Sequence, residues 1–374
     1  MRVRLGLLVT LLVAGMLTAA EPPAGAALPR LSVSVVAGSL DHPWDVAALP
    51  HGRLLVTERS RARLSVIRHG HRRTIPLVGS HLWVSGETGL MGLEVDPRWR
   101  SNHRIYTCQG WGTSASHDVR VIAWRLTKHL REAVPVRTLV AGLPSTSGRH
   151  GGCRLLITRD GSLLIGTGDA ATGTNPRNLG SLGGKTLRVN RFTGRPWRHN
   201  PFRSSSNAKT RLVYTYGHRN VQGLAQRRDG TLWSIEQGTS RDDEVNRLVA
   251  GGDYGYNPVP GYNESVPMTD QSLPGTQIDA RWSSGPTTDA TSGGTFVPNS
   301  RKWKGFRGWL AVAALKNQKL IMLHFSLSGR LLAERTELTG HGRLRTAVVA
   351  PNGDLFVTTD NGDGRDVILR VHPR

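Results

Sequence analysis

Several polar segments of the chain stand beside short apolar runs, and their residue types could do chemistry. The first is RHGGCR at 149–154. A histidine such as His150 can take up a proton near neutral pH, and adjacent glycines let the backbone approach a ligand closely. Taken alone, this histidine is more readily a surface residue or a hydrogen-bonded core residue, so its meaning depends on what the fold brings beside it.

Two further segments carry charge. The run YGHRNVQG at 216–223 contains Arg219, whose guanidinium could pair with a carboxylate through two hydrogen bonds. The run EQGTSRDDEVN at 236–246, followed by GGDYG at 251–255, offers carboxylates and loop carbonyls of the kind that Ca²⁺ prefers. Its spacing is not that of an EF-hand. The alternative without a function is a polar turn for 216–223 and an acidic, solvent-exposed loop for 236–246.

The last segments are cationic. Lys316 follows an apolar run, and Arg343 and Arg345 alternate in a predicted strand, so that they share one face. Each of the four sets, at 149–154, 216–223, 236–255 and these cationic residues, is weak evidence alone. Together they indicate a functional site if the fold brings them to one place.

A repeat predicts such a fold. A turn pair, mostly Asp-Gly or Asn-Gly, precedes an apolar strand and follows another strand in four copies. This unit is typical of a tight hairpin. The copies begin at His51, Asp160, Asp229 and Asn352, and degenerate copies at 92–107 and 309–323 bring the number to six. We therefore expect an all-β, six-bladed β-propeller, in which residues 31–36 pair with residues 367–371. Two β-sandwich domains are the alternative.

The N-terminal segment and the two cysteines indicate an exported protein. A positive start, the apolar run 5–20 and small residues up to Ala26 predict a signal peptide over 1–27 and a single exported domain over 28–374. An uncleaved anchor is the alternative. No later segment is apolar enough to cross a membrane. In an exported chain, Cys108 and Cys153 favour a disulfide over two buried thiols.

The net charge is +22, from 49 Lys and Arg against 27 Asp and Glu. Such a charge attracts polyanions, but the basic residues are scattered and no nucleic-acid-binding motif accompanies them. We therefore expect no dedicated nucleic-acid partner.

Three motifs together resemble the soluble sugar dehydrogenases that use pyrroloquinoline quinone (PQQ) to oxidise glucose and other aldoses. These are Gly-His-Arg-Asn-x-Gln-Gly at 217–223, Glu-Gln-Gly-x-x-x-Asp-Asp-Glu-x-Asn at 236–246 and Gly-Gly-x-Tyr-Gly at 251–255. The likeness runs from about His42 to Val371. It implies a secreted, PQQ- and calcium-dependent enzyme that oxidises an aldose at C1 to the lactone. It also implies an external electron acceptor, either a quinone or a cytochrome.

The resemblance also implies roles for individual residues. His150 would be the general base and Arg219 would polarise the quinone. The residues implied at or near the cofactor are Glu87, Arg219, Asn220, Gln237, Asp243, Lys316, Arg343 and Arg345, the last three opposite its carboxylates. Carbonyls of Gly238 and Thr239 would hold the calcium ion that activates PQQ, and Glu244 and Tyr254 match a second calcium site.

Two of the chain's departures from the family pattern bear on the general base and the cofactor. Arg149 stands where relatives often have an acidic residue, and Glu87 stands where they have glutamine. These changes motivate an alternative, a catalytically silent propeller that binds a ligand or glycan. A calcium-dependent lactonase on the same architecture is a third reading, although no matching carboxylate constellation is visible.

Overall fold

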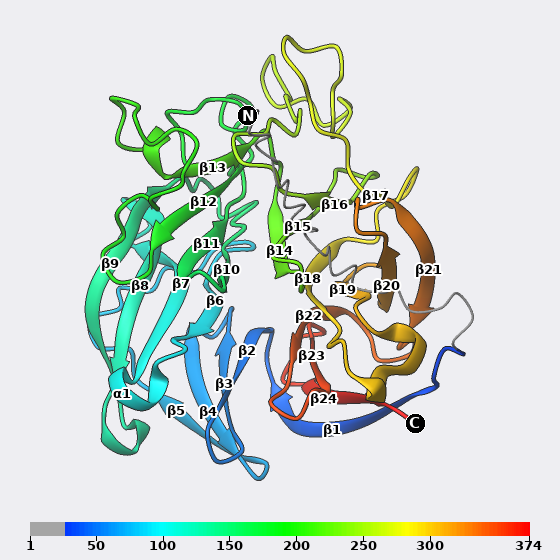
Figure 1. The fold of residues 1–374 in the computed structure, drawn as a ribbon. Helices are drawn as coiled ribbons and strands as arrows, with labels where there is room; N and C mark the ends of the chain where they lie inside the picture. Colours follow the sequence, from blue (N-terminus) through cyan, green and yellow to red (C-terminus); the bar gives the residue numbers. More distant parts are fainter. Residues whose placement is uncertain (1–26) are drawn as a thin grey trace, which may run out of the picture.

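A computed structural model describes residues 27–374; the expected signal peptide, 1–27, falls almost entirely outside this range. Six four-stranded antiparallel sheets are arranged in a ring (Figure 1), which confirms the predicted six-bladed propeller. The first three blades contain these strands: β2 (Pro43–Leu49), β3 (Arg53–Glu58), β4 (Arg63–Arg68) and β5 (His71–Ile75); β6 (Leu90–Val95), β7 (Arg104–Gly112), β8 (His117–Leu126) and β9 (Ala133–Leu143); β10 (Arg154–Ile157), β11 (Ser162–Gly166), β12 (Lys185–Asn190) and β13 (Val213–Tyr216).

The other three blades contain these strands: β14 (Val221–Gln226), β15 (Leu232–Glu236), β16 (Glu244–Arg247) and β17 (Trp282–Ser283); β18 (Thr291–Phe296), β19 (Leu310–Ala314), β20 (Lys319–Phe325) and β21 (Leu331–Glu337); β22 (Leu344–Val349), β23 (Leu355–Thr359), β24 (Asp366–Pro373) and β1 (Leu31–Leu40). Helical turns are α1 (Trp99–Asn102), η1 (Lys128–Leu130), η2 (Thr210–Leu212) and η3 (Arg301–Phe306). Strand β1 pairs with β24, so the ring closes as expected.

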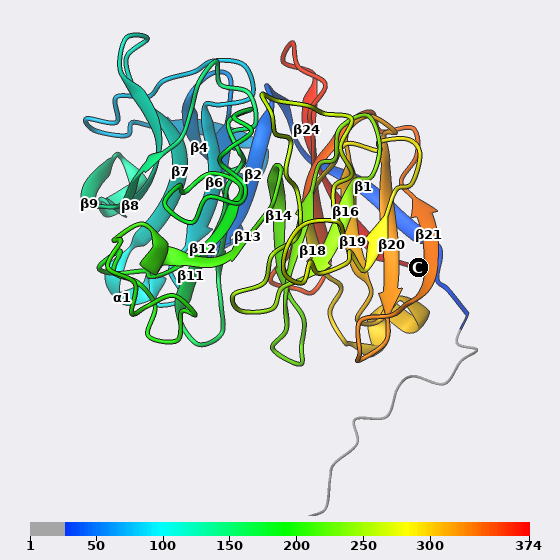
Figure 2. The same ribbon diagram turned by 90° about the horizontal axis from the view of Figure 1, so that it is seen from above.

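The Asp-Gly turns explain why the repeat folds as hairpins. Gly161 and Gly230 have φ of 87° and 93°, which glycine adopts without strain, and they join β10 to β11 and β14 to β15. The first strand of each blade therefore starts at the same end of the ring at which the second strand finishes. Figure 2 shows this end, which we call the mouth, along the upper edge, with α1 along the lower edge.

The predicted copy at 309–323 is shifted by one strand. It comprises β19 and β20, the second and third strands of the fifth blade, and the first strand is β18. The pattern missed β18 because two of its residues, Gly293 and Gly294, carry no side chain. A Cβ at Gly293 would lie 2.3 Å from Oγ1 of Thr346, so crowding around the channel requires glycine there.

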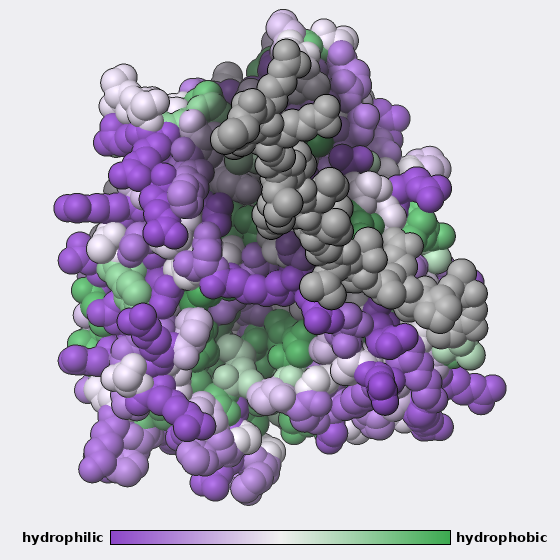
Figure 3. All heavy atoms as spheres, viewed as in Figure 1, coloured by the Kyte–Doolittle hydropathy of each residue, from purple (hydrophilic) through white to green (hydrophobic). Residues whose placement is uncertain are grey.

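The first strands of the six blades line a central channel. On the face opposite the mouth, which Figure 3 shows, hydrophobic residues gather in the hollow at the centre of the ring, where Val46, Leu156, Leu224 and Ala347 line the channel. Deeper in, Nη1 of Arg154 lies 2.8 Å from Oδ2 of Asp45, and its Nε donates to the carbonyl of Gln222. This buried ion pair spans the channel below the mouth.

None of the helices among residues 27–374 is both long enough and apolar enough to span a membrane. Cys108 of β7 and Cys153, just before β10, form a disulfide that joins the second and third blades.

Candidate functional site

His150 is buried at the mouth, in the turn that leads into β10. Its Nδ1 lies 2.8 Å from Oδ1 of Asp169, the third residue after β11, and its backbone N–H donates to Oε2 of Glu87 at 3.0 Å. A carboxylate on Nδ1 fixes the ring and the tautomer. The nitrogen left to meet a ligand is therefore Nε2, the arrangement required of a general base.

Asp169 supplies the carboxylate that the sequence lacked beside the histidine. The residue adjacent in the chain is Arg149, but the antiparallel pairing of β10 with β11 brings Asp169 to the ring instead. Tyr262, from the β16–β17 connection, donates its hydroxyl to Oδ2 of Asp169 at 2.8 Å and lies 3.0 Å from Nδ1 of His150. Burial and the charge of Asp169 raise the pKa of Tyr262, so this hydroxyl stays a neutral donor.

Arg219 lies beside this pair, in the turn between β13 and β14. Its backbone N–H donates to Glu236, its Nη1 donates to the carbonyl of Gln237, and its Nη2 lies 2.5 Å from Oε1 of Glu264. The buried Nε of Arg219 has no hydrogen-bond partner among the described residues. The side chain is thus held by its end, with one donor still available to a ligand.

Asn220 ties the segments together. Its Oδ1 accepts the N–H of Gly152 at 3.1 Å, and its Nδ2 lies 3.5 Å from Oε2 of Glu87 and 3.4 Å from Oε1 of Gln237. The structure therefore places five predicted residues together: His150, Arg219, Asn220, Glu87 and Gln237. The carboxylate of Glu87 accepts hydrogen bonds from the backbone N–H of His150 and from the side-chain amide of Asn220.

A group of arginines gathers around Asp360, which follows β23. Nε of Arg345 lies 2.8 Å from Oδ2 of Asp360, and Nε of Arg343 donates to the carbonyl of the same residue. Arg59, which follows β3, belongs to this group, because burial and then the positive charge of Arg345 lower its pKa. Its buried Nε has no hydrogen-bond partner among the described residues. Lys316 is exposed in the turn between β19 and β20, also at the mouth.

This charge pattern fits a ligand with several carboxylates. Like-charged guanidiniums that gather around one aspartate, with a buried donor unpaired, leave positive charge for an anion to neutralise. PQQ is a tricarboxylate with a quinone, so the arginine group and the free donor of Arg219 suit it. The residues present therefore fit the cofactor that the resemblance implies.

The loop after β15 presents backbone oxygens at the mouth. Gly238 fits only as glycine, because an added Cβ would lie 2.0 Å from the carbonyl oxygen of Arg241. Buried Asp243 accepts the N–H of Gly238 at 2.9 Å and the hydroxyl of Thr288. Asp243 thus shapes the loop, while the carbonyls of Gly238 and half-buried Thr239 suit a hard cation.

Glu244, the first residue of β16, lies beside Glu236 in the fourth blade, and the two carboxylates form an acidic cluster. Nδ2 of Asn246 donates to both Glu236 and Glu244, while its buried Oδ1 has no partner among the described residues. Burial and the charge of Glu236 raise the pKa of Glu244 to about 8. Repelling carboxylates beside an unpaired oxygen fit a cation. The hydroxyl of Tyr254 donates to the carbonyl of Arg247, so only the backbone of Tyr254 could be a ligand.

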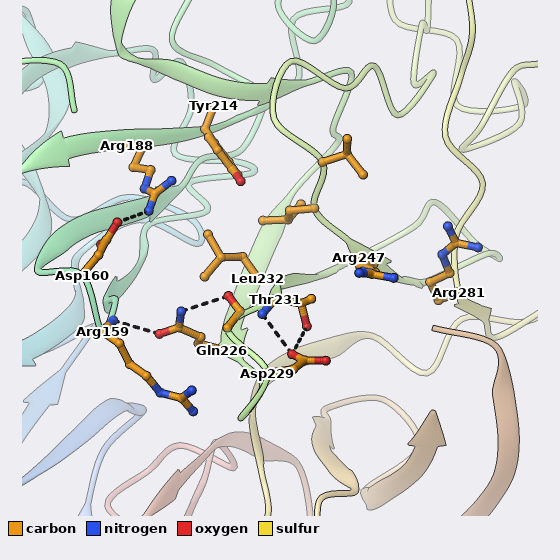
Figure 4. Close-up of a pocket in the computed structure, with 13 residues that line it drawn as sticks. Arg159, Asp160, Arg188, Tyr214, Gln226, Asp229, Thr231, Leu232, Arg247 and Arg281 are labelled. Carbon is orange, nitrogen blue, oxygen red and sulfur yellow. Dashed lines mark hydrogen bonds and ion pairs between the residues drawn. The ribbon is translucent and has the colours of Figure 1, made fainter. Parts of the chain in front are cut away.

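Another pocket lies between the third and fourth blades, at the end opposite the mouth (Figure 4). Its walls carry Arg188, paired with Asp160 at 2.5 Å, together with Arg159, Arg247 and Arg281. Leu232 and the ring of Tyr214 also line it. It brings together none of the predicted site residues, so we place the candidate site at the mouth.

Sequence reasoning missed Asp169, Arg59, Asp360, Tyr262 and Glu264. The first three share a signal, since each stands within three residues after the second strand of a blade, as does the predicted Gln237. Aligning the repeats by these strand ends would have found them. Tyr262 and Glu264 lie in the long β16–β17 connection, where no repeat gives such a signal.

The family model described as Glucose / Sorbosone dehydrogenase matches residues 40–370. The chain is 31% identical to the aldose sugar dehydrogenase YliI of Escherichia coli K12, over 93% of this chain and 95% of that protein. It is 28% identical to quinoprotein glucose dehydrogenase B of Acinetobacter calcoaceticus, over 62% of this chain and 53% of that protein. The PQQ-bound structure of the aldose sugar dehydrogenase of Streptomyces coelicolor superposes with a TM-score of 0.74, at 29% identity, and covers 92% of this chain and 100% of that one.

Proposed function

Since the chain belongs to the glucose/sorbosone dehydrogenase family, we propose that it is a quinoprotein sugar dehydrogenase. In this proposal it uses PQQ and calcium to oxidise the C1 hydroxyl of an aldose to the lactone. The observation that carries the proposal is the His150–Asp169 pair, set beside Arg219 at the same mouth as the arginine group around Asp360.

The residues that would hold the cofactor follow from charge. Arg343, Arg345, Arg59 and Lys316 would pair with its carboxylates, and Asn220 and Gln237 would border it. The carbonyls of Gly238 and Thr239 would hold its calcium ion, and the cluster around Glu244 would hold a structural one. When bound, PQQ with its calcium ion would supply a quinone able to accept a hydride.

The remaining chemistry belongs to the chain. Nε2 of His150 takes the proton of the C1 hydroxyl as the hydride leaves C1, so that a carbonyl forms. Asp169 stabilises the imidazolium through Nδ1, as an oriented carboxylate does in other histidine bases. Arg219 would hold its positive charge toward the quinone oxygens of the bound cofactor, a preorganised contribution that needs no rearrangement during the reaction.

Electrons leave the site for an external acceptor, a quinone or a cytochrome. Export through the segment 1–27 would place the enzyme outside the cytoplasm, where a disulfide such as Cys108–Cys153 persists.

The test is reconstitution. Protein stripped with a chelator is titrated with PQQ and Ca²⁺ while the absorption of the cofactor is followed, and sugars are then added with an electron-accepting dye. We expect tight PQQ binding and dye reduction with aldoses. Bound PQQ without turnover of any aldose or alcohol would support the silent binding propeller instead. Absence of PQQ binding would exclude the quinoprotein altogether.

A further inference from the structure

A carboxylate of the chain itself occupies the mouth beside the candidate base. Glu264 lies in the β16–β17 connection, which contains the yellow-green loops at the top of Figure 1. Its Oε1 lies 2.5 Å from Nη2 of Arg219, and its Oε2 lies 2.7 Å from Nη2 of Arg149. Although burial opposes ionisation, hydrogen bonds from Arg149 and Arg219 hold the pKa of Glu264 below its usual range. Two arginines thus bind one ionised carboxylate.

This carboxylate lies close to the reacting atoms. Arg149 precedes His150 in the chain, and its guanidinium lies 5.6 Å from the centre of the Tyr262 ring. The hydroxyl of Tyr262 contacts both His150 and Asp169. A group bound between the two arginines therefore lies beside Tyr262, whose hydroxyl contacts the histidine.

The arrangement can exchange one anion for another. Arg149 and Arg219 stand beside two carboxylates, Glu264 and Asp169, so the charges balance and a ligand carboxylate would take the place of Glu264. Arg149 is 43% exposed and Glu264 is 33% exposed, so both are reached from the mouth. Asn263 and Ser265, which flank Glu264, are exposed, so little packing opposes movement of this side chain. A neutral sugar that displaced Glu264 would leave both guanidiniums without the carboxylate that they bind here.

We propose that Arg149 and Arg219 form a carboxylate subsite, and that the preferred substrate is an aldose carrying a carboxylate, that is, a uronic acid. The carboxylate at C6 of the sugar displaces Glu264 from between the arginines, and the C1 hydroxyl meets Nε2 of His150. This inference rests on the proposed sugar dehydrogenase function, because it names the substrate class of the same site.

The test uses sugar pairs that differ only at C6, galacturonate with galactose and glucuronate with glucose. A hydrogen-bonded charge pair supports an expected preference in kcat/KM of about 10- to 100-fold for the uronates. The substitution Arg149→Gln should lower the ratio of uronate to neutral sugar about tenfold, and Glu264→Gln should raise it, because a competing carboxylate is lost. Arg365→Gln, an equal loss of charge at a 69% exposed side chain, should leave the ratio unchanged.

Calorimetry with galacturonate and galactose, on protein whose bound PQQ has been reduced beforehand so that it accepts no hydride, separates this inference from the function on which it rests. Equal kcat/KM values for both sugars of each pair would overturn the subsite and leave the dehydrogenase in place. Galacturonate binding that Arg149→Gln weakens, without oxidation of any sugar, would support the subsite and contradict the enzyme. Absence of galacturonate binding would overturn the subsite.

Discussion

Nδ1 of His150 and Oδ1 of Asp169 lie 2.8 Å apart, although the two residues stand at opposite ends of a β-hairpin in the chain. The first strand of that hairpin leaves the mouth and the second returns to it. The pairing makes Nε2 the free nitrogen of the ring, so the base faces the mouth rather than the blade.

Replacement of Asp169 should impair proton transfer to His150 and leave the cofactor site intact. Asp169→Asn keeps the shape but loses the charge that stabilises the imidazolium, so we expect kcat to fall by about 10²- to 10⁴-fold. Affinity for PQQ should change little, as titration of its absorption would measure. Asp160→Asn, at the far end of the same blade, is the matched control, and an equal loss of kcat there would contradict the assignment.

Arg59 should contribute to cofactor binding. Its position beside Arg345 and its unpaired Nε suit a carboxylate of PQQ, and loss of one such charged hydrogen bond corresponds to about a 10- to 100-fold weaker Kd. The measurement is equilibrium titration of Arg59→Gln with PQQ. Arg61→Gln removes the same charge from a 41% exposed side chain paired with Asp41 and should bind PQQ like the unaltered protein.

The stability of the channel should depend on pH through Glu94. Burial and the charge of Asp45 raise its pKa to about 8, from 4.5 in the unfolded chain. Between these values the folded state binds more protons, so its stability falls as pH rises through this window, by roughly 2–4 kcal/mol. Glu94→Gln should flatten this dependence in thermal melts at pH 5, 7 and 9. Exposed Glu132→Gln should retain it, and an unaltered slope in Glu94→Gln would refute the attribution.

The disulfide should support both the fold and the site. Cys108 and Cys153 are 45 residues apart, and closing such a loop stabilises a protein by about 2–4 kcal/mol. The double change Cys108→Ser with Cys153→Ser should therefore lower the melting temperature. It should also lower kcat, because Cys153 is three residues from His150 and anchors its turn to the second blade. Treatment of the unaltered protein with a reductant should have the same two effects, and unchanged values in both experiments would argue against this role.

The architecture was predictable because its signals are local. Each Asp-Gly turn with its two apolar strands is a hairpin wherever it stands, and six such units close into a ring through β1 and β24. The exception is β18, which has no apolar pattern because it contains Gly293 and Gly294. Glycine is required at 293 because Thr346, in the neighbouring blade, leaves no room for a Cβ. The motifs at 217–223 and 236–246 likewise identified loops that do meet at the mouth.

The sequence by itself thus determined the propeller, its closure and most of the residues around the candidate site. Only the tertiary structure decided which side chains complete that site. Arg149 meets Glu264 across 115 residues of chain, and Asn220 meets Glu87 across 133. Such contacts depend on how the blades pack and on the path of the β16–β17 connection. No local pattern of residues encodes that path, because loop backbone follows the surfaces it crosses rather than its own propensities.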